Sequence, residues 1–460
     1  MRKLTYVLCL AILLPCVLSA QNKTNLFNGK NFNGWRILYG TAEYAIDGDQ
    51  IVGTSKMGSP NTFLATKRNY TNFILEYEVK MDEGLNSGVQ IRTSTDKDFK
   101  EGRPFGLQIE CEDSQRGWAG GVFDEARKGW RYPLEYNPKA KSAFKKGEWN
   151  KFKVIAYNNR ILTWVNGVAC SNLVEEEVET GFIGLQVHGI HKKEHLDGKQ
   201  IRWKNIYLQE IGEKDLEQHF VSDAPEVSYL KNELTPKQIK DGWKLLWDGQ
   251  TTKGWRGSKL ENFPENGWEI KDGVLSVLAS DGGESANGGD IVTKRKYKNF
   301  IIEVDFKLTQ GANSGIKYFV DTDLNQGAGS SIGCEFQILD DKKHPDAKKG
   351  TKGNRTIGSL YDLIKANGQE YNPYLPREKY VNAIGQWNRA RIEVKGSHVK
   401  HFLNGCKVVE YDRGTQMWKA LVAYSKYGKW PNFGEFEDGN ILIQDHGDKV
   451  SFKNIKIKEL

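Results

Sequence analysis

The chain repeats itself, and this internal duplication constrains its fold more strongly than any other feature. Short motifs of the first half return in the same order in the second half. The matched motifs are Asn-Ser-Gly (residues 86–88 and 313–315), Trp-Asn (149–150 and 387–388), Asn-Gly (166–167 and 404–405) and Gln-x-His-Gly (186–189 and 444–447). So many matches in one order indicate that one folding unit occurs twice in tandem.

Each repeat alternates apolar and polar residues with a period of two, as in residues 73–80 and 392–395. This period is typical of half-buried β-strands. Asn-Gly and Asp-Gly pairs separate the strands at points where a tight turn needs a positive φ. Since neither repeat has a long helical periodicity, the sequence predicts an all-β fold of two tandem jelly-roll β-sandwiches.

The first twenty residues predict a secretory signal peptide. Arg2 and Lys3 precede an apolar run over residues 4–18, and small residues follow it. The run is too short for a membrane anchor. A proline, Pro15, directly before Cys16 disfavours a lipoprotein signal. No later segment is apolar enough to span a bilayer, so we expect a secreted protein without a membrane span.

The repeat boundaries predict four parts of the chain. The signal peptide takes residues 1–20, the first domain 21–212, a charged linker 213–240 and the second domain 241–460. Within the linker, Thr235 followed by a proline is typical of a helix N-cap. We therefore expect one short helix between two β-domains.

Charge and cysteine usage exclude several classes of function. The formal net charge is +7, and the basic residues are interspersed with nearly as many acidic ones. This pattern lacks the basic patch of a nucleic-acid-binding protein, so no nucleic-acid partner is expected. The sequence has no C-x-x-C or H-E-x-x-H motif, which argues against structural or protease-type zinc. Either one disulfide per repeat or buried free thiols fits the four cysteines that follow the signal peptide, which are Cys111, Cys170, Cys334 and Cys406.

Polar residues inside otherwise apolar strands mark the candidate site of the second repeat. Side chains two positions apart on a strand share a face, and such a face can bind a ligand. This spacing pairs Glu335 with Gln337, and Gln444 with His446. The further candidates of this repeat are Lys317, Asp340, Tyr361, Asp362 and His401.

The first repeat carries a related set. The same spacing pairs Gln108 with Glu110, and Gln186 with His188. The further candidates are Arg92, Asp124 and Glu125. Each residue also has a structural alternative, namely a solvated acid on an edge strand, an aspartate that forms a turn, or a histidine with a structural role.

A sequence alignment of the two repeats suggests that they are not equivalent. It sets Gly106 against Glu335, and Glu110 against Leu339. The acid would then lie at a different position in each domain. We therefore expect the two domains to differ in reaction step or in substrate.

Longer motifs carry a resemblance to a known family. In the second half these are "SGIKYF", "EFQILDDKKHPDA", "GSLYDLI" and "IQDHGDKVSFKNIKIKEL", and in the first half "NSGVQIR", "LQIECEDSQRGWAGGVFDEARKGW" and "LQVHG". Both halves resemble the 3-keto-disaccharide hydrolase family, which is associated with 3-keto-glucoside 1,2-lyase and 3-keto-2-hydroxy-glucal hydratase activity. The resemblance implies a concanavalin-like jelly roll in each half and a secreted enzyme, expected in the bacterial periplasm.

The implied chemistry follows from the ketone. A carbonyl at carbon 3 of a sugar acidifies the hydrogen on carbon 2, so a base can expel the group on carbon 1 by β-elimination, and water then completes a net hydrolysis. The implied substrate is a 3-keto-glycoside, either a small molecule or an oligosaccharide. The residues implied for proton transfer or cation binding are Glu335, Asp340, Asp362, His446, Glu110, Asp124 and His188. Those implied for substrate binding are Lys317, Gln337, Tyr361, His401, Gln444, Arg92, Gln108, Glu125 and Gln186.

Other hypotheses stay open at this point. A sandwich of this kind also serves as a non-catalytic carbohydrate-binding module, because fold does not fix function. A laminarinase-like glycoside hydrolase would carry an E-x-D-x-x-E strand, which the sequence lacks. The sequence does not indicate a particular cofactor for the reaction. Use of a divalent metal ion stays an open alternative. One domain could act as lyase and the other as hydratase.

Overall fold

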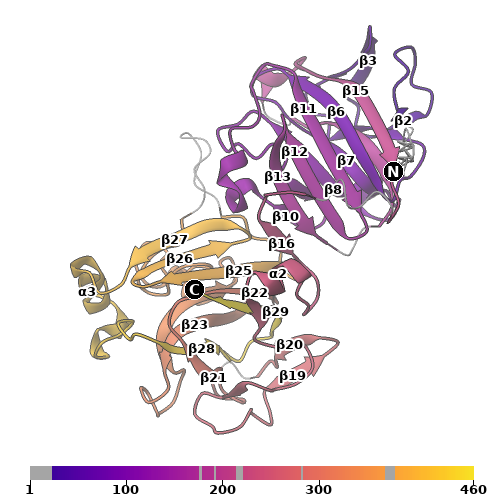
Figure 1. Ribbon diagram of the computed structural model, residues 1–460. Coiled ribbons are helices and arrows are strands. Elements are labelled where there is room, and N and C mark those ends of the chain that lie inside the picture. The colour runs from indigo at the N-terminus through magenta and orange to yellow at the C-terminus, as the bar shows by residue number, and fades with distance from the viewer. Residues whose placement is uncertain (1–22, 176–178, 191–192, 214–220, 281–282, 368–378) are drawn as a thin grey trace, which may run out of the picture.

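The computed structural model describes residues 23–175, 179–190, 193–213, 221–280, 283–367 and 379–460. Within these residues the chain forms two β-sandwiches, which follow one another along the sequence (Figure 1). This confirms the prediction of an all-β fold built from two tandem sandwiches. The predicted signal peptide lies outside the described residues.

The first sandwich consists of two antiparallel sheets and one parallel pairing at its edge. The nine strands of the larger sheet are, in spatial order, β16 (Glu226–Ser228), β13 (Val168–Val174), β12 (Arg160–Val165), β11 (Asn150–Tyr157), β6 (Phe73–Met81), β15 (Gln200–Glu210), β4 (Gln50–Thr54) and β3 (Glu43–Asp47), with β1 (Thr24–Asn25) paired to β15. The seven strands of the smaller sheet are β10 (Gly129–Tyr132), β9 (Val122–Glu125), β8 (Phe105–Glu112), β7 (Asn86–Ser94), β14 (Phe182–Val187), β5 (Thr62–Thr66) and β2 (Trp35–Tyr39).

The second sandwich has the same plan. The eight strands of its larger sheet are β19 (Trp268–Lys271), β20 (Val274–Val277), β29 (Val450–Glu459), β22 (Phe300–Leu308), β25 (Trp387–Lys395), β26 (His398–Leu403) and β27 (Cys406–Asp412), with β17 (Trp243–Leu245) paired to β29. The five strands of its smaller sheet are β18 (Trp255–Gly257), β21 (Ile291–Tyr297), β28 (Gly439–Ile443), β23 (Asn313–Asp321) and β24 (Ile332–Leu339).

The strand orders of the two sandwiches correspond element by element. In the larger sheets β13-β12-β11-β6-β15-β4-β3 matches β27-β26-β25-β22-β29-β20-β19, and in the smaller sheets β8-β7-β14-β5-β2 matches β24-β23-β28-β21-β18. Because strand order is independent of sequence similarity, it supports the duplication separately.

Helices are short and lie between strands. Besides α2 (Pro236–Lys240) and α3 (Gln416–Ala423), the described residues contain the 3₁₀ turns η1 (Lys100–Gly102), η2 (Leu134–Tyr136), η3 (Pro138–Ala140), η4 (Glu194–Leu196), η6 (Pro345–Lys348) and η7 (Lys426–Lys429). None of these segments has the length and apolar character of a membrane-crossing helix. The α3–η7 stretch connects β27 to β28, and the residues described between β13 and β14 contain no helical counterpart.

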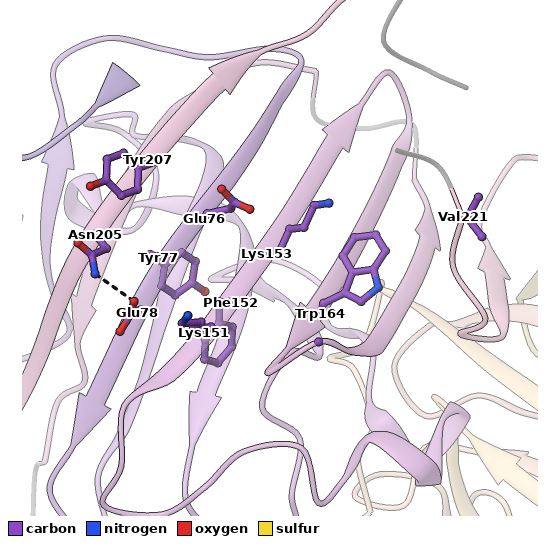
Figure 2. Close-up of a pocket in the computed structure, with 11 residues that line it drawn as sticks. Glu76, Tyr77, Glu78, Lys151, Phe152, Lys153, Trp164, Asn205, Tyr207 and Val221 are labelled. Atoms are coloured by element: carbon purple, nitrogen blue, oxygen red, sulfur yellow. Dashed lines mark hydrogen bonds between the residues drawn. The ribbon is translucent and has the colours of Figure 1, made fainter. Parts of the chain in front are cut away.

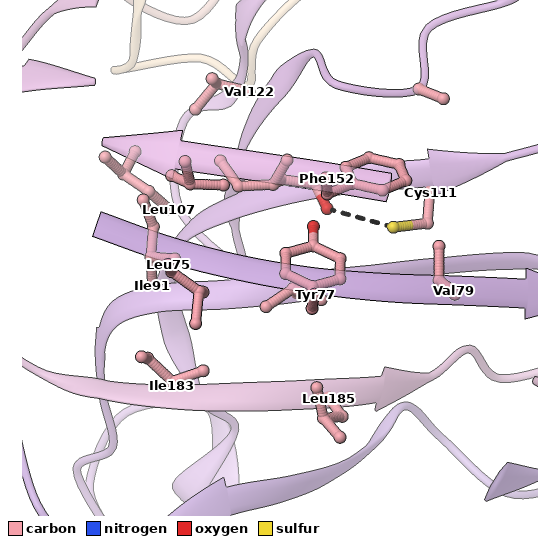
Figure 3. Packing of buried hydrophobic residues seen from close by; sticks show 14 of the residues in the cluster. Leu75, Tyr77, Val79, Ile91, Leu107, Cys111, Val122, Phe152, Ile183 and Leu185 are labelled. Atoms are coloured by element: carbon pink, nitrogen blue, oxygen red, sulfur yellow. Dashed lines mark hydrogen bonds between the residues drawn. The ribbon is translucent and has the colours of Figure 1, made fainter. Parts of the chain in front are cut away.

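The core of each sandwich lies between its two sheets. Figure 3 shows the first core, in which Tyr77 of β6 and Phe152 of β11 stack with ring centroids 5.0 Å apart. Cys111 and Cys170 are buried in this core as free thiols, and the cysteines of the second repeat are also free and buried. The alternative of one disulfide per repeat is therefore wrong, and the thiols pack as small apolar side chains.

The linker is ordered where it is described. Thr235 caps α2 by accepting a hydrogen bond from the Gln238 N–H, which confirms the predicted helix start. Before the helix, β16 extends the larger sheet of the first sandwich by pairing in parallel with β13. Tyr229 follows and lies between two guanidinium groups, with Arg131 of the first sandwich 3.4 Å and Arg389 of the second 4.0 Å from its ring centroid. The linker thus contacts both sandwiches.

Candidate active site

A cluster of polar side chains covers the outer face of the smaller sheet in the second sandwich. Lys317 on β23 lies opposite Glu335 on β24 in the antiparallel register, and Lys317 Nζ is 3.7 Å from Glu335 Oε2. Their chain neighbours Ile316 and Phe336 belong to the core. Since side chains alternate along a strand, a cation and an acid meet on the face away from the core.

Burial sets the electrostatics of Glu335. The side chain is 4% exposed, and desolvation raises its pKa because the charged form loses its hydration. Lys317 and Lys426 oppose this shift, whereas Glu284 adds to it. The net result is a carboxyl group with a raised pKa, which makes it a stronger base than an ordinary glutamate once it is ionised.

Gly315 makes room for this carboxylate. A Cβ at Gly315 would lie 2.4 Å from Glu335 Oε1, a separation that real side chains do not reach. The Asn-Ser-Gly motif of the sequence therefore serves the site, because its glycine lets Glu335 lie across β23.

A hydrogen-bonded chain behind Lys317 fixes its ammonium group. Lys317 Nζ donates to Ser330 Oγ and to the Ser331 carbonyl oxygen at 3.2 Å. Ser330 in turn donates to Asp290, which also accepts the Asp445 N–H at 3.0 Å. The ammonium is thus held toward Glu335 by groups on three other segments of the chain.

Two amide side chains complete the face. The Ile338 N–H donates to Gln337 Oε1 at 3.2 Å, and Gln444 Nε2 donates to Glu284 Oε1 at 2.9 Å. Gln444 Oε1 is buried and accepts no hydrogen bond from the described residues. The same holds for the oxygen of Gln186 in the first sandwich. Buried acceptors are normally satisfied, so both oxygens are suited to a hydroxyl donor of a ligand.

Lys426 belongs to the cluster although the sequence did not single it out. Its ammonium lies 4.2 Å from the ring centroid of Tyr361, and desolvation lowers its pKa while Glu335 opposes the shift. Tyr361 donates from its hydroxyl group to Asp346 at 2.7 Å. Lys426 comes from the α3–η7 insertion, so the repeat comparison that found the other candidates held no signal for it.

Three predicted residues of this domain have structural roles instead. His401 is fully buried between the sheets, where its Nε2 is 2.7 Å from the Tyr318 hydroxyl, and burial lowers its pKa to about 3. Asp340 accepts the N–H groups of Gly311 and Lys342 at 2.8 and 3.0 Å and so closes the loops beside the sheet. Neither side chain lies on the polar face.

Asp362 acts as a support. It accepts Arg355 Nε at 2.7 Å and the N–H of Lys426 at 2.9 Å. These bonds position the turn that carries Lys426 and leave both carboxylate oxygens occupied. Asp362 is therefore better placed to orient Lys426 than to transfer a proton.

His446 lies at the edge of the face, next to two further residues that could bind a metal ion, His344 and Asp448. Its ring centroid is 5.8 Å from that of His344, and the donor atoms of His344, His446 and Asp448 all lie within 4.8 Å of one another. His446 is also among the charges that act on Glu335. The pairing of His446 with the site agrees with the sequence, whereas Asp448 was not singled out.

The first sandwich carries a related hydrogen-bonded row on its smaller sheet. Gln90 Nε2 donates to Gln108 Oε1 at 2.5 Å, and Gln108 Nε2 donates to Glu110 Oε2 at 3.0 Å. Asn86 and Arg116 donate to Glu110 Oε1 at 2.7 and 2.9 Å. Burial raises the pKa of Glu110, and Arg116 opposes this shift. The row brings Gln108 and Glu110 together, as predicted.

The pairing of β7 with β8 and of β23 with β24 corrects the alignment of the two repeats. A Cβ at Gly88 would lie 2.3 Å from the Gln108 side chain, as one at Gly315 would approach Glu335. Gln108 is therefore the counterpart of Glu335, and the pairing of Gly88 with Glu110 makes Glu110 the counterpart of Gln337. The alignment of Gly106 with Glu335 and of Glu110 with Leu339 is wrong by two residues, because a shift of two keeps the face and escapes the periodicity.

Arg92 is not part of this face. It has a φ of 48°, and its guanidinium donates to the carbonyl oxygens of Thr71 and Asn158. Gln90, not Arg92, takes the position of Lys317, two residues after the shared glycine. A bulge in β7 turns Arg92 away from the predicted position.

The remaining predicted residues of the first domain lie in three places. Glu125 accepts from Asn61 and Gln186 at 3.3 and 3.4 Å, so these three are adjacent on the polar face. His188 is exposed, with its Nδ1 2.8 Å from the Gly189 carbonyl oxygen.

Asp124 lies elsewhere in the first domain. It accepts Arg127 Nε at 2.9 Å, and burial raises its pKa. It faces Arg127 rather than Glu110.

A separate groove of about 610 Å³ lies along the larger sheet of the first sandwich, whereas the polar face lies on the smaller sheet. Figure 2 shows Glu76, Lys153 and Trp164 on three neighbouring strands, with Asn205 donating to Glu78 at 3.0 Å. None of the predicted site residues lines it.

Comparison with known proteins assigns the chain to a family. The 3-keto-alpha-glucoside-1,2-lyase-like domain matches residues 22–209 and 242–458, which is most of the sequence. The chain belongs to this family. It carries the 3-keto-alpha-glucoside-1,2-lyase-like domain twice, in agreement with the resemblance and with the two sandwiches.

Individual relatives span about one repeat of this chain. A curated 3-keto-disaccharide hydrolase of Bacteroides thetaiotaomicron is 37% identical over 261 residues, which cover 51% of this chain and 86% of the relative. A solved structure from Parabacteroides distasonis, provisionally assigned as a glycosyl hydrolase, is 30% identical with a TM-score of 0.42 and covers 50% of this chain and 99% of that chain. A second one is 28% identical with a TM-score of 0.34 and covers 47% and 99%.

Proposed function

We propose that the protein cleaves 3-keto-glucosides, and that the polar face of the second sandwich is its active site. Family membership and the name of the curated relative support the substrate class. The observation that carries the proposal is the buried Glu335 carboxylate with a raised pKa, 3.7 Å from the ammonium of Lys317. A base beside a fixed cation is what removal of a proton next to a ketone requires.

The proposed reaction begins with proton abstraction. Glu335 takes the hydrogen on carbon 2, and the electron pair of that C–H bond forms the enolate of the carbon-3 ketone. Lys317 stabilises the negative charge on the enolate oxygen. Its ammonium is fixed beforehand by Ser330, so little reorganisation is needed when the charge develops.

Elimination and hydration follow. The enolate re-forms the ketone, a double bond forms between carbons 1 and 2, and the bond from carbon 1 to the aglycone oxygen breaks. Lys426 protonates this oxygen, since desolvation makes its ammonium a stronger acid. Water then adds its hydroxyl group to carbon 1 and gives its other proton to the neutral Lys426 amine, and carbon 2 regains a proton from Glu335. The sum is hydrolysis of the glycosidic bond.

Substrate hydroxyl groups would bind to the amides of the face. Gln444 Oε1 accepts one hydroxyl, because it is buried without a donor from the described residues. We further propose that residues 1–20 direct the protein out of the cytoplasm and that it acts on sugars in the bacterial periplasm.

A carbohydrate-binding role is the second candidate for the first sandwich alone. In the first sandwich the neutral Gln90 takes the position of Lys317. Arg116 donates a hydrogen bond to Glu110 there. This face retains amide and acid groups for sugar hydroxyls but lacks the lysine that would stabilise an enolate.

The experiment that tests the proposal is incubation of the purified protein with a 3-keto-disaccharide. Release of the aglycone sugar and a transient ultraviolet absorbance from the conjugated enone are expected. If the sugar is released without the enone even under rapid mixing, direct hydrolysis replaces elimination. If the substrate binds and is not cleaved, the protein is a binding protein.

A further inference from the structure

We propose that His344, His446 and Asp448 form a binding site for a first-row divalent cation at the edge of the polar face. Their donor atoms lie within 4.8 Å of one another. Two imidazoles and one carboxylate are a donor set that zinc, cobalt and manganese accept, whereas calcium and magnesium prefer oxygen ligands alone.

The side chains are close to the geometry that a cation needs. Two ligands each about 2.1 Å from one zinc ion can be no more than about 4.2 Å apart. The separations of up to 4.8 Å exceed this limit by about 0.6 Å, so the three side chains have to move slightly closer together to hold one ion. All three residues are half-buried, so they combine partial desolvation with access for the ion.

The surroundings prepare two of the ligands. His344 accepts the Asp346 N–H at Nδ1, so this nitrogen carries the lone pair that metal binding requires. Asp448 is oriented by the Asn313 N–H, which donates to it at 3.0 Å. The side-chain oxygen of Asn313 is itself buried and accepts no hydrogen bond from the described residues.

Binding has a defined local consequence. His344 Nδ1 now accepts the Asp346 N–H at 3.1 Å. A neutral imidazole has one lone pair, so this hydrogen bond is lost whichever ring nitrogen binds the cation. The amide signal of Asp346 therefore reports cation binding at His344 directly.

The first sandwich provides a natural negative control. Its His188 corresponds to His446, but the position of Asp448 is taken by the apolar Ile190. Within the residues that the structure describes, no group of two imidazoles and a carboxylate lies around His188. The site is a property of the second sandwich and coincides with the domain that carries Lys317 and Glu335.

A cation here would have open positions for substrate oxygens, since the protein supplies three ligands. Its role in the reaction rests on the proposed function: a cation at the edge of the face would polarise a sugar carbonyl or hydroxyl group. The site itself rests on the ligand geometry alone.

The test uses the full chain without a histidine tag, after treatment with a chelator. Titration with Co²⁺ followed by its visible absorption, and with Zn²⁺ by calorimetry, should show one saturable site. H344A and H446A should each weaken binding by more than about 100-fold, beyond the effect of losing an outer-shell partner. H188A should bind as the parent does.

D448N is a second variant that separates binding from folding, because its amide oxygen can still accept the Asn313 N–H. It should fold with an unchanged melting temperature in the absence of metal and bind Co²⁺ weakly. Absence of saturable binding, or binding by H344A as tight as that of the parent, would overturn the cation site. Such a result would not contradict the proposed cleavage of keto-sugars. Binding of cation by a protein that does not cleave the keto-sugar would instead contradict the proposed function.

Discussion

Where the second sandwich places Lys317 against Glu335, the first places Gln90 against Gln108. The strand order around these pairs is the same, and a glycine makes room for the longer side chain in both. The acid of the first sandwich is Glu110, which lies two residues after Gln108 on the same face of β8. The cation paired with Glu110 is Arg116. The duplicated fold thus preserves a polar face while its charges have been rearranged.

The larger sheets differ in a second way. In the second sandwich Arg389 bonds Asp305 on the outer face, and the linker residues Ser228 and Tyr229 cover the pair. The first sandwich has Lys151 at the position of Arg389, and it lines the open groove of Figure 2. Equivalent strands therefore carry a buried ion pair beneath Ser228 and Tyr229 in one sandwich and an exposed lysine at an open groove in the other.

Loss of the Glu335 carboxylate should have the largest effect. E335Q should lower kcat/KM for a 3-keto-disaccharide by about 10³-fold, within the range of a general base. E110Q, the matched variant, should change the rate by less than about tenfold, since Glu110 is the counterpart of Gln337 and not of Glu335. Steady-state kinetics of both variants tests the comparison. Equal losses would show that both faces take part in the same step.

Removal of Arg389 should destabilise the protein strongly. R389M leaves Asp305 buried without its main partner, which should lower the free energy of unfolding by about 3–5 kcal/mol. The matched K151M should stay within about 0.5 kcal/mol, because Lys151 is exposed. Urea unfolding with a probe for each sandwich measures both. A small effect of R389M would mean that the linker does not bury the pair in solution.

The same pair should make the second sandwich sensitive to acid. Burial raises the pKa of Asp305, but Arg389 and its hydrogen bonds outweigh this and the net pKa is lowered. A lowered folded-state pKa means that the pair stabilises the protein at neutral pH and that this stabilisation is lost as the pH falls toward the folded-state value. In R389M this part of the acid dependence should disappear, which unfolding curves between neutral and acidic pH would show.

Conversion of Lys317 to the residue of the first sandwich should have an intermediate effect. K317Q should lower kcat by about 10²-fold, the loss expected for one donor to a developing oxyanion. Lys317 also lowers the pKa of Glu335, so its removal should raise that pKa and move the acidic limb of the kcat/KM profile to higher pH. A purely structural lysine would reduce the rate without moving that limb. Circular dichroism controls for folding.

The sequence predicted the fold because its signals are local and repeated. The period-two strands, the turn glycines and the Thr235 cap each specify their own conformation, and the duplication doubled the evidence for them. The site was predicted in part for the same reason. Glu335 and Gln337 follow the strand alternation, and Gln444 and His446 recur in the first half as Gln186 and His188.

What the sequence could not show depends on contacts between distant segments. Lys426 reaches Glu335 only because the α3–η7 insertion folds over the face. His401 obeys the same alternation as the site residues, yet its strand belongs to the larger sheet and points it into the core. Alternation gives the two faces of a strand but not which face meets the other sheet.

The smallest effect should come from the contact between the two domains at Tyr380. This residue of the second half lies with its ring centroid 5.4 Å from that of Trp118, and Arg116 Nη1 donates to its hydroxyl at 3.4 Å. Y380F removes that hydroxyl and should lower the free energy of unfolding by about 0.5–1 kcal/mol. Y424F, at a position that is 95% exposed, is the control and should change nothing measurable.

The same variant shows whether the first face depends on the second domain. Arg116 bonds both Tyr380 and Glu110, so the second domain helps to position the acid of the first. If each sandwich functions alone, Y380F should leave sugar binding by the first face unchanged within about twofold. If Y380F changes sugar binding without changing the stability, the two sites are coupled rather than separate. The altered position of Arg116 would then be the only cause of the change in binding.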